Sequence, residues 1–309
     1  MSEFLGVDTS NYTTSAAVYG GGKIRQGKKL LPVREGELGL RQSDAVFHHV
    51  QQLPEVLESV LASCGKISAA GVSARPRDTE GSYMPCFTVG VGTARAISQA
   101  LKVPLHVFSH QAGHIAAALY SAGRLDLLGQ RFLAFHVSGG TTEAVIAEPD
   151  AKQVLRVQIA ASSLDLKGGQ AVDRVGAMLG LRFPAGRELE RLALESEARY
   201  SPKPSIKGCC CSLSGVENKC RDMLGRGERK EDVARFCLDY LGASLDAMCA
   251  ALLKEYGNLP VLFAGGVMSN TILRDRLEQK YGAYFADPEY SSDNAAGIAV
   301  LTALLEAGL

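Results

Sequence analysis

Apolar and polar residues alternate along the chain with two periods that replace one another in a regular order. Short apolar runs with a period of two, typical of strands, are followed by longer segments with apolar residues at helical spacing. The first three runs, joined by a polar turn and by Gly20 to Gly22, predict an opening β-meander. The strands predicted in the first half are FLGVDT, TSAAVYG, KIRQGKKLLPV, ISAAGVSA and PLHVFS. The predicted helices are Asp44 to about Leu61, Thr88 to Leu101, and HQAGHIAAALYSAG, which ends at Gly123.

The second half begins with the same arrangement of strands. FLAFHVSGGTTEAVIAE is a strand, a small polar turn and a second strand, and VLRVQIA is a third. A repeat of this size predicts two related α/β lobes, residues 1–115 and 116–289, with the last helix, 290–309, packing back on the first lobe. Further helices are predicted at Gly169 to Leu179, Arg187 to Glu197, Lys230 to Tyr256 and Ser269 to Tyr281, with the strand PVLFA before the last of them. The segments predicted at the surface are Pro202 to Lys207 and Gly225 to Glu231.

Composition limits the classes of partner. Of the 309 residues 46% are hydrophobic, which is enough for a substantial core, and Lys plus Arg equals Asp plus Glu at 33 each. No global positive field therefore draws the chain to nucleic acid or to an anionic membrane, so a nucleic-acid partner needs a local cluster, such as Arg221 to Lys230, or a helper protein. The start MSEFLGVDTS lacks the features of a signal peptide, and no apolar run approaches ~20 residues. We expect a cytoplasmic protein.

Eight cysteines are present, three of them consecutive at Cys209 to Cys211. No paired CxxC spacing of the kind used by structural zinc sites occurs. The main interpretation is small buried thiols plus one unusual loop. A redox or metal role for the triple cysteine is the alternative.

His110 and His114 form the first candidate site. Their i, i+4 spacing on a predicted helix puts both rings on one face, which suits a single metal ion. The HExxH motif of zinc proteases has this spacing, but here Gln111 takes the place of the glutamate base. On spacing alone, two histidines that merely line a helix are an equal alternative. Asp293, near the start of the last helix, could supply a third ligand and leave coordination positions open.

Small polar turns at the ends of strands form the second candidate site. Asp8 to Ser10, Ser138 to Thr142 and Ala264 to Gly266 each follow an apolar strand. Open α/β sheets bind ligands at the carboxyl ends of their strands, and glycine lets backbone N–H groups approach phosphate oxygens closely. A helix after Gly266 would add its positive N-terminal end. Together these turns predict a nucleotide site.

The motifs VDTSNYTTSAAVY, HQAGH, VSGGTT, SSLDLKGGQAVDRVGAMLGLRFPAG, SLSG, AGGVMSN and SSDNAA, in this order, resemble the tRNA threonylcarbamoyladenosine transferase family, formerly labelled O-sialoglycoprotein endopeptidase. The resemblance runs from about residue 4 to 300. It implies an α/β fold of the actin-like ATPase and sugar-kinase type with two related mixed-sheet lobes. It also implies transfer of a threonylcarbamoyl group from threonylcarbamoyl-AMP to a tRNA adenosine next to the anticodon.

Carried over residue by residue, the resemblance implies metal ligation by His110, His114 and Asp293. The ligand contacts that the resemblance and the glycine turns imply are at His136, Val137, Ser138, Gly139, Gly140, Asp173, Gly186, Gly265, Gly266 and Asn270. Asp8 and Ser10 are candidates for a catalytic role that the sequence does not assign. The expected cofactors are one divalent ion, iron or alternatively zinc or magnesium, and an adenylate-type nucleotide. The expected partners are threonylcarbamoyl-AMP or ATP/ADP, tRNA with helper proteins, and a related actin-fold subunit in a heterodimer, but no membrane.

Some positions depart from the family pattern. Asn11, Tyr12 and Thr13 stand where Cys, Asp and Glu are expected, and Thr141 stands where a His is expected. CSLSGVE replaces FSFSGLK, and the loop VSARPRDTEGSYMPCF, with its charges from Arg75 to Glu80, replaces a glycine-rich one. That loop is either a solvated loop or a changed substrate contact.

These departures predict a divergent paralogue and leave three functions open. The first is the tRNA transferase. The second is an ATPase or a carbamoyl or phosphoryl transferase on another acceptor, and the third is a non-catalytic nucleotide-binding subunit. A peptidase is a weaker fourth, because HQAGH lacks the base.

Overall fold

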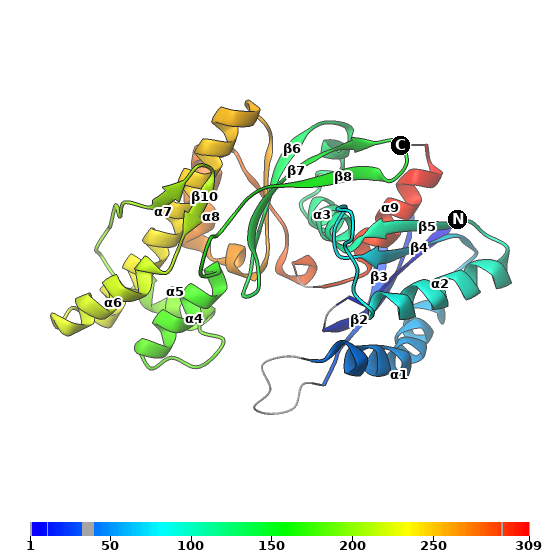
Figure 1. The fold of residues 1–309 in the computed structure, drawn as a ribbon, viewed down its shortest axis with the longest axis horizontal. Coiled ribbons are helices and arrows are strands. Elements are labelled where there is room, and N and C mark those ends of the chain that lie inside the picture. The colour runs from blue at the N-terminus through cyan, green and yellow to red at the C-terminus, as the bar shows by residue number, and fades with distance from the viewer. Residues whose placement is uncertain (1, 11, 33–39, 292, 309) are drawn as a thin grey trace. The chain divides into compact units, whose positions relative to one another are not determined.

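The computed structural model describes residues 2–10, 12–32, 40–291 and 293–308. Contacts between Cα atoms divide the chain into two compact units, each an α/β assembly (Figure 1). Unit 1 comprises Met1–Gln130, Ala147–Val157 and Glu289–Leu309, and unit 2 comprises Arg131–Ile146 and Gln158–Pro288. The chain therefore passes from unit 1 to unit 2 twice, with Ala147–Val157 returning to unit 1 in between, and ends in unit 1 with its last helix.

Unit 1 is built on a five-stranded mixed sheet in the order β3-β2-β1-β4-β5. The predicted meander is confirmed, because β1 pairs antiparallel with β2 and β2 with β3, while β4 and β5 run parallel to β1. These strands are β1 (Glu3–Asp8), β2 (Thr13–Gly20), β3 (Lys23–Leu30), β4 (Ile67–Arg75) and β5 (Leu105–Ser109). Since β1, β4 and β5 are parallel, their carboxyl ends meet at one edge, where Asp8 and Ser109 lie.

The helices of unit 1 are α1 (Gln42–Leu61), α2 (Phe87–Leu101), α3 (His110–Ser121) and α9 (Ala296–Glu306), with the short 3₁₀ helices η1 (Leu125–Gly129) and η3 (Pro288–Tyr290). The last helix, α9, packs on α3 and on the sheet. It begins later than predicted, because the Asn294 side chain accepts a hydrogen bond from Ala296 N at 3.0 Å and starts the helix there.

Helices α3 and α9 approach each other at the level of the backbone. A Cβ atom built on Gly297 would lie 1.8 Å from the carbonyl oxygen of Gly113, so only glycine permits this contact. The predicted lobe division at residue 115 falls inside α3, whereas the contacts place the whole of α3 in unit 1. This close contact fixes the segment before α9 next to the first turns of α3.

Unit 2 contains a second five-stranded sheet, in the order β12-β11-β6-β7-β8, which confirms the predicted repeat of the strand pattern. Strand β11 runs parallel to β6, so Ala264 lies opposite His136 near the ends of their strands. The strands are β6 (Phe132–Val137), β7 (Thr142–Asp150), β8 (Val154–Ser162), β11 (Val261–Ala264) and β12 (Tyr284–Phe285). The end of β7 and the start of β8 belong to unit 1 by their contacts.

Helices and a small hairpin complete unit 2: α4 (Gly168–Met178), α5 (Gly186–Leu194), β9 (Ser205–Lys207), β10 (Cys210–Ser212), α6 (Gly215–Gly225), α7 (Lys230–Tyr256), η2 (Gly266–Ser269) and α8 (Thr271–Tyr281). Helix α6 was not predicted. Its buried residues Val216, Cys220 and Met223 have helical spacing, but they are few and are surrounded by polar residues.

Helix α7 requires a correction to the expectation about apolar runs. It contains an 18-residue window with a mean hydropathy of 1.5, long and apolar enough to span a membrane, but 72% of that window is buried within the protein. Residues from Val233 to Leu252 of this helix belong to the core of unit 2. This burial is typical of a core helix.

The triple cysteine forms part of the β9–β10 hairpin. Cys210 and Cys211 belong to β10, and Cys211 is buried. Burial raises the pKa of Cys211 to about 11, and burial together with Glu255 raises that of Cys209 to about 11. Because a protonated thiol is a poor nucleophile and a poor metal ligand, the surroundings favour the interpretation of structural thiols.

Candidate metal centre and ligand-binding turns

Three potential metal ligands meet in unit 1. His110 and His114 lie on the first two turns of α3, and Asp293 lies three residues before α9. One donor atom of each lies within 4.8 Å of the other two. Asp293 Oδ1 is 3.4 Å from His110 Nε2 and 3.1 Å from His114 Nε2. The structure thus brings together all three residues that the sequence singled out.

Local structure explains the placement of the histidines. Strand β5 ends at Ser109, whose side chain caps α3 by accepting a hydrogen bond from Ala112 N at 3.2 Å. His110 is therefore the first residue of the helix, and His114 follows one turn later. Their ring centroids are 4.3 Å apart. The contact between Gly113 and Gly297 brings Asp293 within reach of both rings.

The distances from Asp293 to the two histidines fit a shared ion. Two ligand atoms that each lie about 2.1 Å from an ion are roughly 3.0 to 3.4 Å apart at octahedral or tetrahedral angles, in line with the two distances to Asp293. The side chains of His110, His114 and Asp293 are 17%, 14% and 24% exposed, so the cluster remains open on one side. Two imidazoles and one carboxylate suit iron or zinc better than magnesium, which prefers oxygen ligands.

Asp8 lies behind this cluster. It is buried, and its Oδ2 lies 2.7 Å from His110 Nδ1 while its Oδ1 accepts a hydrogen bond from Ser10 N at 2.8 Å. A carboxylate that accepts from Nδ1–H fixes the tautomer in which Nε2 carries the free lone pair. The geometry therefore gives Asp8 the position of a residue that orients a metal ligand.

The charges in this group are strongly coupled. Burial alone would raise the pKa of Asp8, but the adjacent His110 holds it below its ordinary value. Burial alone would lower the pKa of His110, but the charge of Asp8, aided by Asp293, raises it to about 10. A cation that binds Nε2 must therefore displace a proton.

Ser10, the second catalytic candidate, is buried beside Asp8. Among the described residues its Oγ has no hydrogen-bond partner. A buried hydroxyl without a partner costs free energy, which a ligand could offset. Of the three positions that depart from the family pattern in this turn, Asn11 lies outside the described residues. Tyr12 contributes its carbonyl, which accepts a hydrogen bond from Leu31 N at 2.8 Å.

The charged loop from Arg75 to Glu80 is anchored to the start of α3. Arg75 forms an ion pair with the buried Asp78 at 2.7 Å, and Gln111 N donates to Pro76 O at 3.1 Å. Gln111 is the neighbour of His110. The loop is thus held against the helix that carries the histidines.

The turn after β6 in unit 2 is the clearest of the predicted anion sites. Ser138 N donates to Thr141 O at 2.7 Å, and Gly169 N, at the start of α4, donates to Ser138 O at 3.0 Å. Gly139 and Gly140 are exposed, and a Cβ atom on either would meet nothing within 4 Å. Packing within the protein does not require these glycines, so their backbone is open to a ligand. His136 and Val137 precede them in β6.

In the turn after β11, unlike the turn after β6, one of the glycines is required by the fold. Gly265 has a φ of 101°, and a Cβ atom there would lie 2.2 Å from Val137 O, so this glycine is required by the fold. A Cβ atom on Gly266 would meet nothing within 4 Å. The Asn270 side chain caps α8 by accepting a hydrogen bond from Leu273 N at 3.1 Å. Gly265 and Asn270 thus have structural roles in addition to any contact with a ligand.

Asp173 and Gly186 lie near each other in sequence and are linked in space. Asp173 Oδ1 accepts a hydrogen bond from Ala185 N at 2.9 Å, which ties α4 to the start of α5. Gly186 is the first residue of α5, and a Cβ atom there would meet nothing within 4 Å. All ten predicted ligand residues lie in unit 2, and the three predicted metal ligands lie in unit 1.

Asp165 is an organising residue that the sequence did not single out. Its carboxylate accepts hydrogen bonds from Leu166 N at 2.6 Å, Leu213 N at 2.7 Å and Ser214 Oγ at 2.6 Å. It therefore joins the loop before α4 to the start of α6. Burial alone would raise the pKa of Asp165, but the bonds from Ser214 and from the two backbone groups lower it. An aspartate within a turn before a helix was the available signal.

Comparison with known proteins adds a sequence relationship. The family model for tRNA N6-adenosine threonylcarbamoyltransferase, TsaD, matches residues 37–300. A protein of this name from Thermus thermophilus is 30% identical over 314 residues, covering 96% of this chain and 90% of its own length. The one from Methanopyrus kandleri is 29% identical over 270 residues, covering 84% of this chain and 75% of its own length.

Solved structures share the fold at low identity. HypF in its phosphate- and nucleotide-bound form superposes with a TM-score of 0.61 at 14% identity, over 99% of this chain but only 55% of HypF. Component A of (R)-2-hydroxyglutaryl-CoA dehydratase from Acidaminococcus fermentans gives 0.57 at 15% identity, over 100% of this chain and 99% of its own. With two mixed five-stranded sheets, the chain has the actin-like ATPase and sugar-kinase fold, as predicted.

Proposed function

The chain belongs to the tRNA N6-adenosine threonylcarbamoyltransferase family, and from this premise we propose that it transfers a threonylcarbamoyl group from threonylcarbamoyl-AMP to the N6 amine of a tRNA adenosine next to the anticodon. The observation that carries the proposal is the cluster of His110, His114 and Asp293, whose donor atoms lie within 4.8 Å of one another. A centre with these ligands and an open side suits a reaction on a phosphate-activated carbonyl.

In the proposed reaction, the amine nitrogen forms a bond to the carbamoyl carbon, and the bond from that carbon to the AMP phosphate oxygen breaks. AMP leaves with the electron pair, and the amine proton passes to solvent. His110, His114 and Asp293 would hold one divalent ion, which we take to be iron, with zinc or magnesium as alternatives. When bound, the ion supplies positive charge that neutralises phosphate or polarises the carbonyl. Asp8 keeps the His110 ring in the orientation that this requires, through the 2.7 Å contact at Nδ1.

The adenylate part is assigned to unit 2. The open backbone at Gly139 and Gly140 donates to phosphate oxygens, and the exposed Gly266 leaves room for the same ligand. The remaining assignments follow the chemistry of the side chains. Asp173 accepts from ribose hydroxyls with the oxygen that does not bind Ala185 N, and Asn270 donates from its amide nitrogen while its oxygen caps α8.

We further propose that the chain works in the cytoplasm with helper proteins. Its relatives from Thermoplasma volcanium and Thermoplasma acidophilum are each named as a probable bifunctional tRNA threonylcarbamoyladenosine biosynthesis protein, and this chain covers 48% and 56% of their lengths. Those relatives carry additional segments. The helper proteins that we propose include a related actin-fold subunit that forms a heterodimer with this chain.

The experiment that tests the function is direct. The purified chain with its bound metal is incubated with labelled threonine, bicarbonate, ATP, the enzyme that makes threonylcarbamoyl-AMP, and unmodified tRNA, with and without helper proteins. Mass spectrometry of the digested tRNA should detect N6-threonylcarbamoyladenosine. His110→Ala and Asp293→Ala should abolish it. His106→Ala is the matched control, because His106 lies in unit 1 but pairs with Glu306 away from the cluster, at 2.6 Å.

Absence of product with a working family enzyme beside it would reject the proposal. If ATP were then hydrolysed or another acceptor were carbamoylated, the departures at Tyr12 and Thr13 would mark a changed acceptor. If nucleotide bound tightly without turnover, the chain would be a non-catalytic subunit.

A further inference from the structure

A basic pocket in unit 2 has no part in the proposed chemistry. It has a volume of about 410 Å³ and lies between α7, α8 and the irregular segment 196–204. Four of its lining residues are cationic, Arg199, Arg235, Arg276 and Lys280, and one, Asp239, is acidic. In a chain whose charges balance at 33 to 33, this is a local concentration of positive charge.

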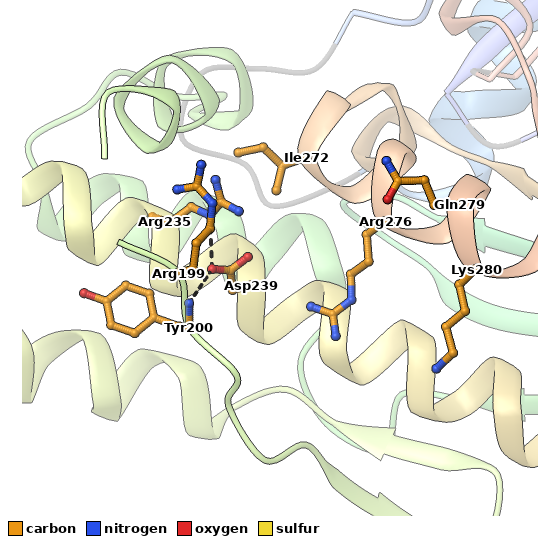
Figure 2. Close-up of a pocket in the computed structure, with 8 residues that line it drawn as sticks. All are labelled: Arg199, Tyr200, Arg235, Asp239, Ile272, Arg276, Gln279 and Lys280. Carbon is orange, nitrogen blue, oxygen red and sulfur yellow. Dashed lines mark hydrogen bonds and ion pairs between the residues drawn. The ribbon is translucent and has the colours of Figure 1, made fainter. Parts of the chain in front are cut away.

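Part-buried hydrogen bonds hold the walls of the pocket in place. Figure 2 shows two bonds that converge on Asp239, one from Arg235 Nε at 3.0 Å and one from Tyr200 N at 3.1 Å. The same segment is anchored a second time where Ser196 Oγ donates to Asp232 Oδ1 at 2.5 Å. Arg199, which lies between these two anchors, is exposed. Its position is therefore set before any ligand arrives, which lowers the entropic cost of binding.

The opposite wall comes from α8. Arg276 and Lys280 are spaced i, i+4, so they share one face of the helix, and in Figure 2 both side chains extend from α8 toward α7. There Asp246 lies 2.6 Å from Lys280 Nζ and 3.6 Å from Arg276 NH2. The side chain of Lys280 is 52% exposed and that of Arg276 is 35% exposed. Because the two cations share this one carboxylate and both reach solvent, they can also contact an anionic ligand.

An aromatic residue connects this pocket to a neighbour. Tyr200 lines the basic pocket and also an adjacent one of about 250 Å³, whose lining has two cations, Lys219 and Arg226, and two acids, Asp222 and Glu228. Its ring packs edge-on against Phe236 at 5.3 Å, which fixes its orientation. Fixed aromatic rings among Arg and Lys side chains are typical of surfaces that bind single-stranded or looped nucleic acid.

The basic stretch Arg221 to Lys230 contrasts with this pocket. Arg221, Arg226 and Arg229 each pair with a glutamate within four residues, at 2.8, 2.8 and 3.3 Å. Lys230 Nζ donates to Leu179 O at 2.9 Å. Each of these arginines thus has an acidic partner of its own. The four cations of the basic pocket share only two carboxylates, Asp239 and Asp246, so the excess of positive charge is larger there.

We propose that the basic pocket binds the phosphodiester backbone of RNA and is a docking surface for the tRNA that accepts the threonylcarbamoyl group. This inference rests on the proposed function for the identity of the RNA. Guanidinium groups bind phosphate oxygens in a bidentate manner, and the pocket is large enough for a nucleotide unit. The surface lies wholly in unit 2 and contacts the backbone rather than a base, so it contributes affinity and not sequence preference.

The test compares tRNA binding by the full chain and by the double variant Arg276→Gln/Lys280→Gln, using labelled unmodified tRNA over a series of salt concentrations. Each lost phosphate contact should reduce the slope of log K against log salt by roughly 0.7 to 0.9, which is ~5- to 8-fold in Kd per contact at about 0.1 M salt. The control Arg191→Gln/Arg229→Gln removes the same charge from unit 2. Those arginines are 67% and 65% exposed and pair with glutamates outside the pocket.

The expected result is a rise in Kd of roughly tenfold or more with a smaller salt slope for the pocket variant, and little change for the control. In the modification assay, KM for tRNA should rise while kcat is retained. Wild-type activity with equal tRNA Kd and slope in both variants would overturn the inference and leave the proposed function intact. Wild-type tRNA binding without modified product would reject the function alone.

Other ligands give distinct outcomes in the same experiment. If the pocket variant lost binding of inorganic phosphate or AMP but kept its tRNA Kd, the pocket would be a small-anion site. If it lost binding of a poly-glutamate peptide alone, the pocket would bind an acidic protein. Either result would overturn the proposal for RNA.

Discussion

Asp8 and His110 are 102 residues apart in sequence, yet Asp8 Oδ2 lies 2.7 Å from His110 Nδ1. The contact exists because β1 and β5 both run parallel to β4 and end at the same edge of the sheet. The aspartate that ends β1 thus meets the histidine that follows β5. The ring nitrogen on the other side, Nε2, faces Asp293 at 3.4 Å.

We predict that Asp8→Ala weakens metal binding without removing a metal ligand. Loss of such an outer carboxylate typically lowers metal affinity about 10- to 100-fold. Competition with a chelator of known affinity measures the change, and saturating metal should restore most of the transfer rate. Asp126→Ala, on an exposed carboxylate of unit 1, is the control. Undiminished affinity in Asp8→Ala would exclude the orienting role, and a rate that metal cannot restore would point to direct catalysis.

We predict that Gly297→Ala destabilises unit 1 and weakens the metal site together. The added Cβ atom would lie 1.8 Å from Gly113 O, so α3 and α9 must separate, and Asp293 must move away from the histidines. Overpacking of this kind costs ~1–3 kcal/mol. Urea unfolding and a metal titration provide the two readouts.

Gly92→Ala is the matched control for this variant. A Cβ atom at Gly92, inside α2, would meet nothing within 4 Å, so the substitution should raise the free energy of unfolding by roughly 0.5–1 kcal/mol. Equal effects of the two substitutions would show that the backbone contact between α3 and α9 is unimportant.

We predict that Gly139→Ala separates ligand binding from folding. The space around its Cβ is empty, so the free energy of unfolding should change by less than ~0.5 kcal/mol, but an adenylate should bind at least several-fold more weakly. Gly265→Ala should instead destabilise the fold, because its Cβ would lie 2.2 Å from Val137 O. Calorimetry with a non-hydrolysable adenylate and thermal unfolding distinguish the two effects. Unchanged adenylate affinity in Gly139→Ala would remove this turn from the ligand site.

Asp165 gives a prediction about how the stability of the protein depends on pH. Its folded pKa is lowered, so its contribution to stability is fully present above the ordinary pKa near ~3.9 and is lost as pH falls through the folded value. Since Asp165 is exposed enough for water to screen it, we expect Asp165→Asn to lower the free energy of unfolding at pH 7 by only about 1 kcal/mol. The difference should shrink as pH falls through the lowered pKa of the folded state. The exposed Asp275→Asn serves as control, and a difference that does not depend on pH would contradict the assignment.

The sequence predicted the elements of the fold well, because strong apolar periodicity marks both sheets and the long helices. It missed α6, whose three buried side chains, Val216, Cys220 and Met223, are too few to stand out among polar neighbours. The spacing of His110 and His114 is local, so it could be read directly. The third ligand, 179 residues beyond His114, depends on the backbone contact of Gly113 with Gly297, which no local pattern reveals.

Two further features, the contact of Asp8 with His110 and the basic pocket, could not be predicted because they depend on long-range packing. Asp8 was expected in a catalytic turn, but its contact with His110 requires the strand order of the sheet. The basic pocket assembles Arg199, Arg235 and Arg276 from three separate segments, each unremarkable in sequence. The sequence drew attention to Arg221 to Lys230 instead, because charges that follow one another are visible and their local pairing is not.

The central claim is that the ion held by His110, His114 and Asp293 is required for transfer to tRNA. The most direct test strips the metal with a chelator, restores iron in steps, and measures bound metal per chain and N6-threonylcarbamoyladenosine formed in the same samples. The account predicts that product rises with occupancy and saturates at one ion per chain, with neither signal in Asp293→Ala. Full product formation by metal-free protein, or by Asp293→Ala without bound metal, would contradict it.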